Sequence, residues 1–316
     1  MTTKQTVYIV LLSYKNIYDT LECVKSILNL NSNDYKILII ENSEDPSYFN
    51  KINNSFIKNN FDFKSVNQNE LYNFYNQKIL LIKANENNGF SAGNNIALKY
   101  IIKNSKPIDY VWILNNDTVL KNNTLDILIK SFEEIRKTEK LGILGAKLVY
   151  YHDKNKIQAI GGEFIESLLI STPVGEGKDV NTIFHKSIDY VVGASMFTTI
   201  EFIKNVGLLS EEYFLFYEEL DWIYRSKKYN YTISYCNEAI VYHKEGTSIG
   251  SSTSNKKSDF SEIHLFISRK KFVEKFYKKN ITFYLSSIAL ILNRLRKGKI
   301  KLSYKLYKIM IGNYEK

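Results

Sequence analysis

The feature that most constrains the fold is an alternation of short apolar runs with helical patterns in the first third of the chain. The apolar runs are four to six residues long and are separated by amphipathic stretches such as residues 17–30 and 91–103. They predict strands at Val7–Leu12, Lys36–Ile40, Ile79–Ile82 and Tyr110–Leu114. Strands that alternate with helices of about 10–15 residues form βαβ units. The predicted fold class is therefore α/β, with a mixed, mostly parallel central sheet flanked by helices.

The second half of the chain gives a less regular pattern. Apolar stretches predict strands at 143–151, 157–164, 188–199, 231–235 and 239–242, and a helix at 218–228. From about residue 260 onward the pattern is helical and basic. We therefore expect one domain over residues 1–258 and a basic helical C-terminal extension over residues 259–316.

The positive charge of the chain is concentrated in that extension. The net charge is +10, and between Arg269 and Lys308 thirteen Lys and Arg residues accompany a single acid, Glu274. A basic residue beside an anionic leaflet contributes about 1 kcal/mol of attraction, so we expect the extension to bind an anionic membrane surface. The alternative is a solvated basic helix pair that packs on the body.

We do not expect the chain to cross a membrane. The longest apolar stretch near the C-terminus, Ile281–Leu292, is too short to span a bilayer. The first residues lack the apolar region of a signal peptide. Cys23 and Cys236 have no CxxC spacing, which fits a reducing compartment. The expected location is cytoplasmic, peripheral at the inner face of the cell membrane.

Polar residues follow the predicted strands. Ser13-Tyr14, Glu41-Asn42, Asn85–Gly89 and Asn115-Asn116-Asp117 each come directly after an apolar run. The carboxyl ends of parallel strands form the usual ligand-binding edge of such a sheet. The segment Asn87–Asn95 opens a helix, where Gly89 permits a tight turn, Gly93 a close approach, and Ser91 a cap for an anion-binding N-terminus. Its alternative interpretation is an ordinary turn before a capped helix.

Two features indicate a metal ion. Asp117 ends an apolar strand, where a carboxylate can hold a hard cation against a diphosphate. His243 ends another strand and precedes Lys244–Ser248, and its neutral imidazole is a possible second ligand. The alternatives are an Asx-turn at Asp117 and a structural or exposed histidine.

Three carboxylates occur within four residues of Phe216–Trp222, at the start of a predicted helix. One of these carboxylates could act as a general base toward an acceptor hydroxyl, and a neighbour at helical spacing could orient it or hold an acceptor. The alternative is that acids at a helix N-terminus only complement the helix dipole, which we expect for Glu218.

Together these segments resemble family 2 of the inverting glycosyltransferases, which have the GT-A fold, and in particular rhamnosyltransferase-like and galactofuranosyltransferase-like members. The resemblance covers roughly residues 6–250 and also includes Gly193–Met196 and Gly207–Leu209. It implies a metal-dependent transfer of a hexosyl or deoxyhexosyl group from a UDP- or dTDP-linked sugar. The implied acceptor is a hydroxyl of a glycan or lipid-linked saccharide in surface polysaccharide synthesis.

The resemblance also assigns roles to residues. Asp117 and His243 would bind Mn²⁺ or Mg²⁺, and Glu219 would be the base, with Asp221 as the second candidate. Two departures are notable: Asn115 and Asn116 stand where acids often occur, and Glu219 where aspartate is usual. The donor nucleotide sugar would be bound by Ser13, Tyr14, Glu41, Asn42, Asn87, Gly89, Phe90, Gly93, Asn94 and Asn116.

Three other functions are alternatives to the glycosyltransferase. A nucleic-acid-binding module would use the basic tail, but the rest of the chain is nearly neutral and carries no nucleic-acid motif, so we expect no nucleic-acid partner. A nucleotidyltransferase would bring a glycine-rich phosphate loop near the first strand, whereas Ser13–Asn16 contains no glycine. A non-catalytic protein that binds carbohydrate or nucleotide sugar remains the main alternative.

Overall fold

The computed structural model describes residues 5–74, 76–244, 258–277 and 281–312. Its main sheet contains ten strands: β1 (Val7–Ser13), β2 (Tyr35–Glu41), β3 (Lys64–Asn67), β4 (Ile79–Lys83), β5 (Tyr110–Asn115), β6 (Thr118–Leu120), β7 (Leu141–Tyr150), β8 (Ile157–Ala159), β11 (Ser195–Thr199) and β12 (Thr232–His243). Strands β9 (Gly161–Ile165) and β10 (Ile170–Val174) form a separate antiparallel hairpin.

The described helices are α1 (Ile17–Leu28), α2 (Ser47–Lys58), α3 (Gly89–Asn104), α4 (Thr124–Ile135), α5 (Ile200–Val206), α6 (Glu218–Ser226), α7 (Asp259–Phe276), α8 (Ile281–Arg296) and α9 (Ile300–Ile311). Short 3₁₀ turns lie at Gln68–Asn73 and Lys227–Tyr229.

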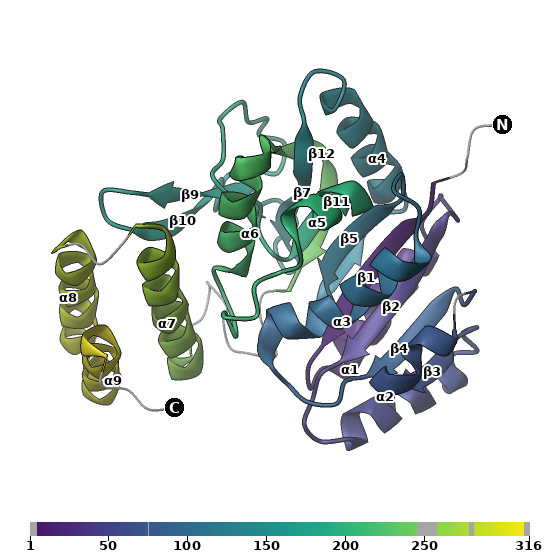
Figure 1. Ribbon diagram of the computed structural model, residues 1–316, viewed down its shortest axis with the longest axis horizontal. Helices are drawn as coiled ribbons and strands as arrows, with labels where there is room; N and C mark the ends of the chain where they lie inside the picture. The colour runs from purple at the N-terminus through teal and green to yellow at the C-terminus, as the bar shows by residue number, and fades with distance from the viewer. Residues whose placement is uncertain (1–4, 75, 245–257, 278–280, 313–316) are drawn as a thin grey trace.

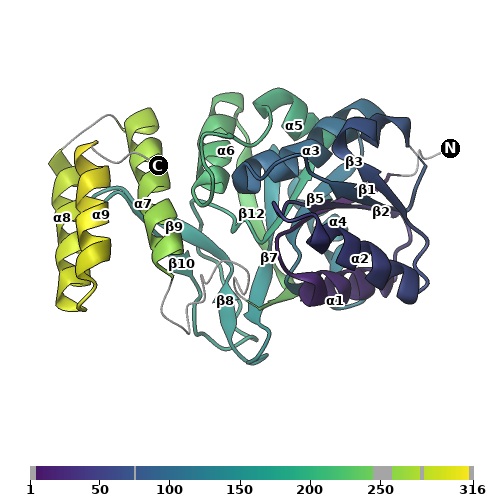
Figure 2. The ribbon, with the colours of Figure 1, turned by 90° about the horizontal axis from the view of Figure 1, so that it is seen from below.

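The sheet order is β3-β4-β2-β1-β5-β11-β7-β12-β6, with β8 beside β7. Figure 1 shows the strands from β3 to β12, and Figure 2 shows β8. The first five strands in this order, β3, β4, β2, β1 and β5, are parallel to one another. Strand β12 is parallel to β7. Strands β6, β8 and β11 pair antiparallel. The predicted α/β class with a mixed, mostly parallel sheet is confirmed.

Helices cover both faces of the sheet (Figure 2). One face buries the apolar sides of α1, α2 and α4, and the other buries those of α3, α5 and α6. The sequence forms this arrangement because the central strands are apolar along nearly their whole length, as strands covered on both faces must be. Each helix supplies the apolar stripe that completes one core.

Several predicted elements differ from the structure. The stretch predicted as one strand at 157–164 is divided between β8 and β9, which belong to different sheets. Glycine is required at position 162, near the start of β9, because a Cβ there would lie 2.0 Å from Tyr190 Cζ. Of the strand predicted at 188–199 only β11 forms, since Tyr190 instead makes an isolated bridge to Gly162.

Two further differences concern β12 and α4. The two strands predicted at 231–235 and 239–242 are one strand, β12, with a register shift between Cys236 and Ile240. No helix was predicted at the position of α4, although its residues Leu125, Leu128 and Phe132 have helical spacing and are buried.

The basic C-terminal segment lies beside the hairpin at one end of the molecule (Figures 1 and 2). Its first helix, α7, is part of the core, because Phe266, Phe272 and Val273 are buried there. Eleven of the thirteen basic residues are described, and six of these bond to the protein itself: Arg269, Lys270, Lys271, Lys275, Arg294 and Lys299.

Candidate active site

A cleft of about 200 Å³ opens at the carboxyl ends of β1, β2 and β5. The start of α3, the loop before α6 and the first turn of α7 close its other sides. Seven of the residues predicted from the sequence line it: Tyr14, Asn42, Asn87, Gly89, Phe90, Asn116 and Asp117. The structure therefore brings together polar residues from four separate segments of the chain.

Ser13 and Glu41 are buried rather than among the lining residues of this cleft. Ser13 Oγ donates to Glu41 Oε2 at 2.6 Å, and the Ser43 backbone N–H donates to Glu41 Oε1 at 2.9 Å. Burial raises the pKa of the Glu41 carboxyl, while the two hydrogen bonds oppose that shift. The pair ties the end of β1 to the end of β2, and its contact with the donor stays a prediction.

The start of α3 is held close to two neighbours by glycines. Gly89 has a φ of 90°, and a Cβ there would lie 2.2 Å from the Phe214 carbonyl oxygen. The Phe90 backbone N–H donates to that oxygen at 2.8 Å. At Gly93 a Cβ would lie 2.4 Å from Leu12 Cδ1. A side chain at either position would clash with these neighbours. Both glycines therefore allow the start of α3 to pack closely against Phe214 and Leu12.

Side-chain amides form further hydrogen bonds at the start of α3. Asn42 Nδ2 donates to Asn87 Oδ1 at 2.8 Å, and Asn94 Nδ2 donates to the Phe90 carbonyl at 2.9 Å. The cap predicted at Ser91 is wrong, because α3 begins at Gly89 and Ser91 is buried inside its first turn. Among the described residues, Asn42 Oδ1, Ser91 Oγ and Asn94 Oδ1 have no hydrogen-bond partner.

Asp117 and His243 meet at one end of the cleft. His243 Nε2 lies 3.1 Å from Asp117 Oδ1, and both side chains are buried. Backbone pairing fixes their spacing, because His243 is opposite Thr118 in the β12–β6 ladder and the Lys244 N–H donates to the Asp117 carbonyl at 3.0 Å. Residues 245–248, the rest of the predicted histidine motif, lie outside the described residues.

This pair fits a divalent cation. His243 Nδ1 is 2.8 Å from Gln158 Oε1, so a proton on Nδ1 leaves Nε2 as the acceptor that faces Asp117. Adjacent ligands about 2.1 Å from an octahedral ion lie about 3.0 Å apart, close to the observed separation of the two atoms. In the described part of the chain no three His, Cys, Asp or Glu side chains gather as a metal site. Any ion would take its remaining ligands from donor oxygens and water.

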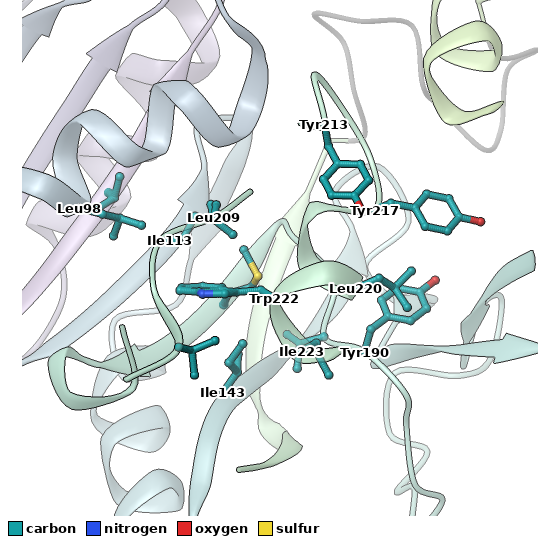
Figure 3. Close-up of a cluster of buried hydrophobic side chains, with 14 of the residues drawn as sticks. Leu98, Ile113, Ile143, Tyr190, Leu209, Tyr213, Tyr217, Leu220, Trp222 and Ile223 are labelled. Atoms are coloured by element: carbon teal, nitrogen blue, oxygen red, sulfur yellow. The ribbon is translucent and has the colours of Figure 1, made fainter. Parts of the chain in front are cut away.

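The loop before α6 has a strained backbone. Phe216 and Tyr217 have φ values of 68° and 69°, in the left-handed region that bulky residues rarely adopt. Packing compensates for this strain: Tyr217 is buried beside Tyr190 and Leu220, and Trp222 lies among Leu98, Leu209 and Ile143 (Figure 3). The two unusual residues set the direction in which the following carboxylates enter the helix.

Glu218 and Glu219 follow this turn. Glu218 is 4% exposed and Glu219 is partly buried, and Oε2 of each has no hydrogen-bond partner among the described residues. Burial raises the pKa of both carboxyls, to about 7 for Glu219, and the Glu219 charge raises that of Glu218 further. Glu218 is a buried acid in the first turn of α6, where the sequence predicted an acid that complements the helix dipole.

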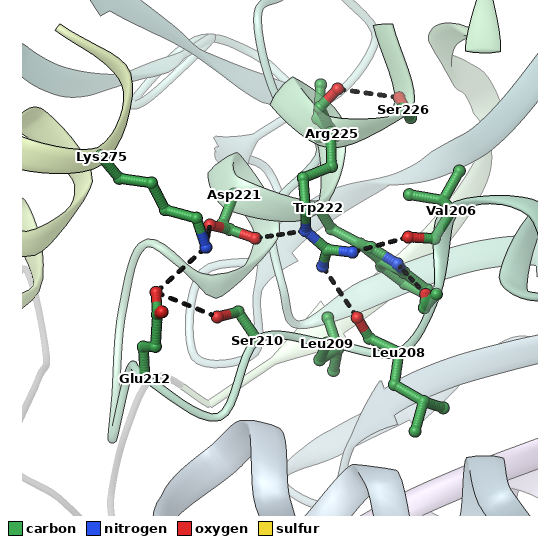
Figure 4. A network of polar contacts seen from close by, with 12 residues as sticks. Val206, Leu208, Leu209, Ser210, Glu212, Asp221, Trp222, Arg225, Ser226 and Lys275 are labelled. Carbon is green, nitrogen blue, oxygen red and sulfur yellow. Dashed lines mark hydrogen bonds and ion pairs between the residues drawn. The ribbon is translucent and has the colours of Figure 1, made fainter. Parts of the chain in front are cut away.

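Asp221 has a different environment (Figure 4). Its carboxylate is fully buried and lies 2.6 Å from Arg225 Nε and 2.8 Å from Lys275 Nζ. Tyr213 OH also donates to it, at 3.1 Å. Arg225 in turn donates to the carbonyls of Val206 and Leu208. These contacts join α6 to α7 and to the loop after α5.

Comparison with known proteins identifies the family of this chain. The model of the family described as glycosyl transferase family 2 matches residues 8–193, more than half of the chain. This chain belongs to glycosyl transferase family 2.

Relatives of this family 2 chain are distant. The low-salt glycan biosynthesis hexosyltransferase Agl10 of Haloferax volcanii is 25% identical over 166 residues, which are 52% of this chain and 51% of that protein. The alignment thus spans about half of the length of this curated relative.

Solved structures agree in fold. The crystal structure of S. aureus TarS matches with a TM-score of 0.51 at 12% identity and covers 92% of this chain and 43% of that one. The structure of S. aureus TarS 1-349 in complex with UDP has a TM-score of 0.50 at 12% identity, with coverage of 92% and 71%. At these identities the likeness concerns the fold, and it agrees with the predicted GT-A architecture.

Some lining residues of the family 2 cleft were missed by sequence reasoning: Leu12, Glu44, Phe214, Leu215 and Phe260. Glu44 had a weak signal, since it follows the predicted Glu41-Asn42 pair, and it accepts from Asn87 Nδ2 at 3.0 Å. Phe214 and Phe260 gave no signal because their positions depend on long-range packing, in which His264 joins both rings. No helix in the part of the chain described here is both long and apolar enough to cross a bilayer.

Proposed function

We propose that this chain transfers a hexosyl or deoxyhexosyl group from a UDP- or dTDP-linked sugar to a hydroxyl of a glycan or lipid-linked saccharide. The observation that carries the proposal is the pair Asp117–His243, held 3.1 Å apart at the cleft and backed by Gln158. A carboxylate and a correctly oriented imidazole beside a cleft suit a cation that accompanies a diphosphate. Family membership supports the same activity.

The donor would lie along the carboxyl ends of β1, β2 and β5. We assign the nucleoside to Tyr14, Asn42 and Asn87, whose amides and ring line the cleft. The diphosphate would reach Asp117 and His243. Ser13 and Glu41 would act from beneath by fixing the strand ends. UDP is the first nucleotide to test because the TarS structure with this fold holds UDP.

The proposed reaction is a single displacement with inversion at the anomeric carbon. Glu219 takes the proton of the acceptor hydroxyl, whose oxygen forms the new bond to that carbon. The bond from the carbon to the diphosphate oxygen breaks on the opposite face, and the nucleoside diphosphate leaves. A divalent cation, Mn²⁺ or Mg²⁺, would supply neutralisation of the charge on the leaving group. The raised pKa of Glu219 matches a general base that works near neutral pH.

Asp221 is the weaker candidate for the base. Two cations and a tyrosine hydroxyl already contact its carboxylate, so its oxygens are engaged within the protein. We infer that Asp221 positions α6 and thereby Glu219.

We also propose a peripheral location at the inner face of the cell membrane, with α8 and α9 as the contact. Both helices expose apolar side chains at helical spacing, 43 to 74% exposed: Ile281, Leu285, Ile288, Leu292 and Leu295 on α8, and Ile300, Tyr304, Tyr307 and Ile311 on α9. Exposed cations such as Lys297, Lys301 and Lys305 accompany this apolar face. Apolar side chains together with nearby cations suit an anionic lipid surface.

Thermal unfolding with UDP, dTDP or GDP, each with and without Mn²⁺, tests donor binding. At about a hundred times the dissociation constant, a bound nucleotide adds roughly 2.7 kcal/mol of stability, a shift of about 5–10 °C. We expect a Mn²⁺-dependent shift with one pyrimidine diphosphate, absent in His243→Ala and retained in His152→Ala, a change at an exposed histidine. The absence of a shift with every nucleotide would contradict the proposed function.

Turnover tests the base. Glu219→Gln should keep the nucleotide shift and lose transfer by about 100-fold or more, while Glu201→Gln, at an exposed acid of α5, should change neither. Normal transfer by Glu219→Gln would remove Glu219 as the base. A nucleotide shift in a wild-type protein with no turnover of any donor would favour the non-catalytic binding protein.

A further inference from the structure

A second cavity, of about 230 Å³, lies between β10, the loop before α6 and the three C-terminal helices. Its apolar side is formed by Leu265 of α7, Leu290 of α8 and Leu306 of α9. None of the predicted site residues lines it. The cavity therefore belongs to the fold but has no part in the donor site described above.

The polar side of this second cavity is basic. Arg269 and Arg294 line it together with one acid, Glu262. Glu262 is already neutralised, because Arg294 Nε donates to Oε2 and Lys299 Nζ lies 2.6 Å from Oε1. Lys299 also pairs with Asp259 at 3.5 Å. Arg269, Arg294 and Lys299 are thus three cations beside two acids, which leaves one positive charge in excess.

Arg269 is the main source of that excess. It is 3% exposed, and burial lowers its pKa. Its guanidinium donates to the carbonyls of Leu168 and Leu169 and to the hydroxyls of Ser286 and Ser287. All four partners are neutral, no described carboxylate pairs with it, and four bonds leave one of five N–H groups available. A buried cation without a counter-charge is costly unless an anion joins it.

The second cavity adjoins the candidate catalytic loop. Leu215 lines the donor cleft and Tyr217 lines the second cavity, so the loop before α6 separates the two. Helix α7 does the same, with Phe260 in the cleft and Glu262 in the cavity. Tyr217 is also within electrostatic reach of both Arg269 and Glu219. A ligand that occupied both spaces would run along the loop before α6.

We propose that the second cavity binds the phosphate ester and the first methylenes of a lipid-linked acceptor, with Arg269 and Arg294 at the phosphate and the leucines around the chain. This inference rests on the proposed function, in which the saccharide of that acceptor reaches the donor cleft. The ligand class follows from the chemistry, since an anionic head suits the arginines and an alkyl chain suits the apolar wall. The partly exposed Arg294, at 22%, marks the end nearest to solvent.

Octyl phosphate, kept below its critical micelle concentration, is the probe, and titration calorimetry on the full chain is the measurement. We expect it to bind at least tenfold more tightly than either inorganic phosphate or octyl glucoside, because only octyl phosphate offers both parts. Leu290→Trp should fill the cavity and weaken binding at least tenfold. Ile57→Trp, on the exposed side of α2 and outside both cavities, is the matched control and should bind as the wild type.

A second pair of variants protects the test if Leu290→Trp folds poorly. Arg294→Gln leaves Glu262 paired with Lys299 and should also weaken binding, whereas Lys58→Gln, at an exposed lysine of α2, should not. Wild-type affinity in Arg294→Gln, or equal binding of inorganic phosphate and octyl phosphate, would overturn the proposal.

The nucleotide shift separates this proposal from the proposed function. Retention of the UDP shift in Leu290→Trp would show that its donor cleft is intact and that its defect lies in the second cavity. A wild-type protein that binds octyl phosphate but no nucleotide would contradict the proposed function and leave the cavity assignment standing.

Discussion

Glu218 and Glu219 are neighbouring carboxyls that the fold keeps away from water. Each has an oxygen without a hydrogen-bond partner among the described residues, and burial raises the pKa of both. A carboxyl whose pKa is raised on folding costs stability above its ordinary pKa, because the unfolded chain releases the proton more readily. The pair is therefore a local weakness that the fold tolerates, which is typical of catalytic groups.

Substitution of Glu218 by Gln should relieve this cost. The variant should match the wild type near pH 4, where the carboxyl is protonated in both the folded and unfolded states. It should become more stable than the wild type as the pH rises from about 4.5 through the raised pKa, by about 1–3 kcal/mol at pH 8. Urea unfolding at the two pH values measures it, and a pH-independent difference would show that Glu218 is not a buried acid.

Helix α6 connects the candidate base to the rest of the molecule. Trp222 buries its ring in the core and donates to the Gly207 carbonyl at 2.8 Å, while Asp221 bonds to Arg225 and Lys275. The Asp221 and Arg225 contacts lie on the side of α6 away from Glu219. The helix is thus fixed by groups that need not touch any substrate.

Asp221→Asn should destabilise the protein by about 3 kcal/mol, because it leaves the partly buried Arg225 without its counter-charge and Lys275 with Glu212 alone. Denaturant unfolding at neutral pH measures the loss, and Asp153→Asn, at an exposed residue, is the control. A loss below about 1 kcal/mol would mean that the network contributes little. Nucleotide binding should survive below the unfolding temperature, since none of these residues lines the donor cleft.

Elements with a strong local pattern could be predicted from the sequence, and elements defined by distant contacts could not. Strands β1, β2, β4 and β5 were identified within two residues because each is a continuous apolar run between polar segments. The division at Gly161-Gly162 depends on the Tyr190 ring, which is distant in the sequence. The same distinction holds for the site: Asp117 follows its strand directly, whereas the burial of Glu218 and the position of Phe260 depend on tertiary packing.

At the scale of the whole molecule, the C-terminal helices differ in what they contact. Helix α7 is bonded to the body through Arg269, Lys271 and Lys275. Helices α8 and α9 pack on α7 through one side and expose apolar side chains on the other. We therefore propose that α8 and α9 act at the membrane and that α7 acts with the body.

Vesicle binding tests this assignment. Leu285→Ser with Leu292→Ser should reduce partitioning onto vesicles rich in phosphatidylglycerol by about tenfold or more, because each leucine loses several buried methylene equivalents at about 0.8 kcal/mol each. Leu168→Ser, at an exposed leucine outside these helices, is the control. Equal co-sedimentation of both proteins would exclude the apolar face of α8 as the contact.

Helix α7 contributes Phe260 to the donor cleft near one end and Lys275 to the Asp221 ion pair near the other. Exchange of C-terminal tails between members of the family would therefore not be modular at residue 258. A chimaera joined there would import a foreign wall for the nucleotide and a foreign partner for α6. A junction after α7 would leave both in place, so only the helices from α8 onward could be exchanged without a change at the donor cleft.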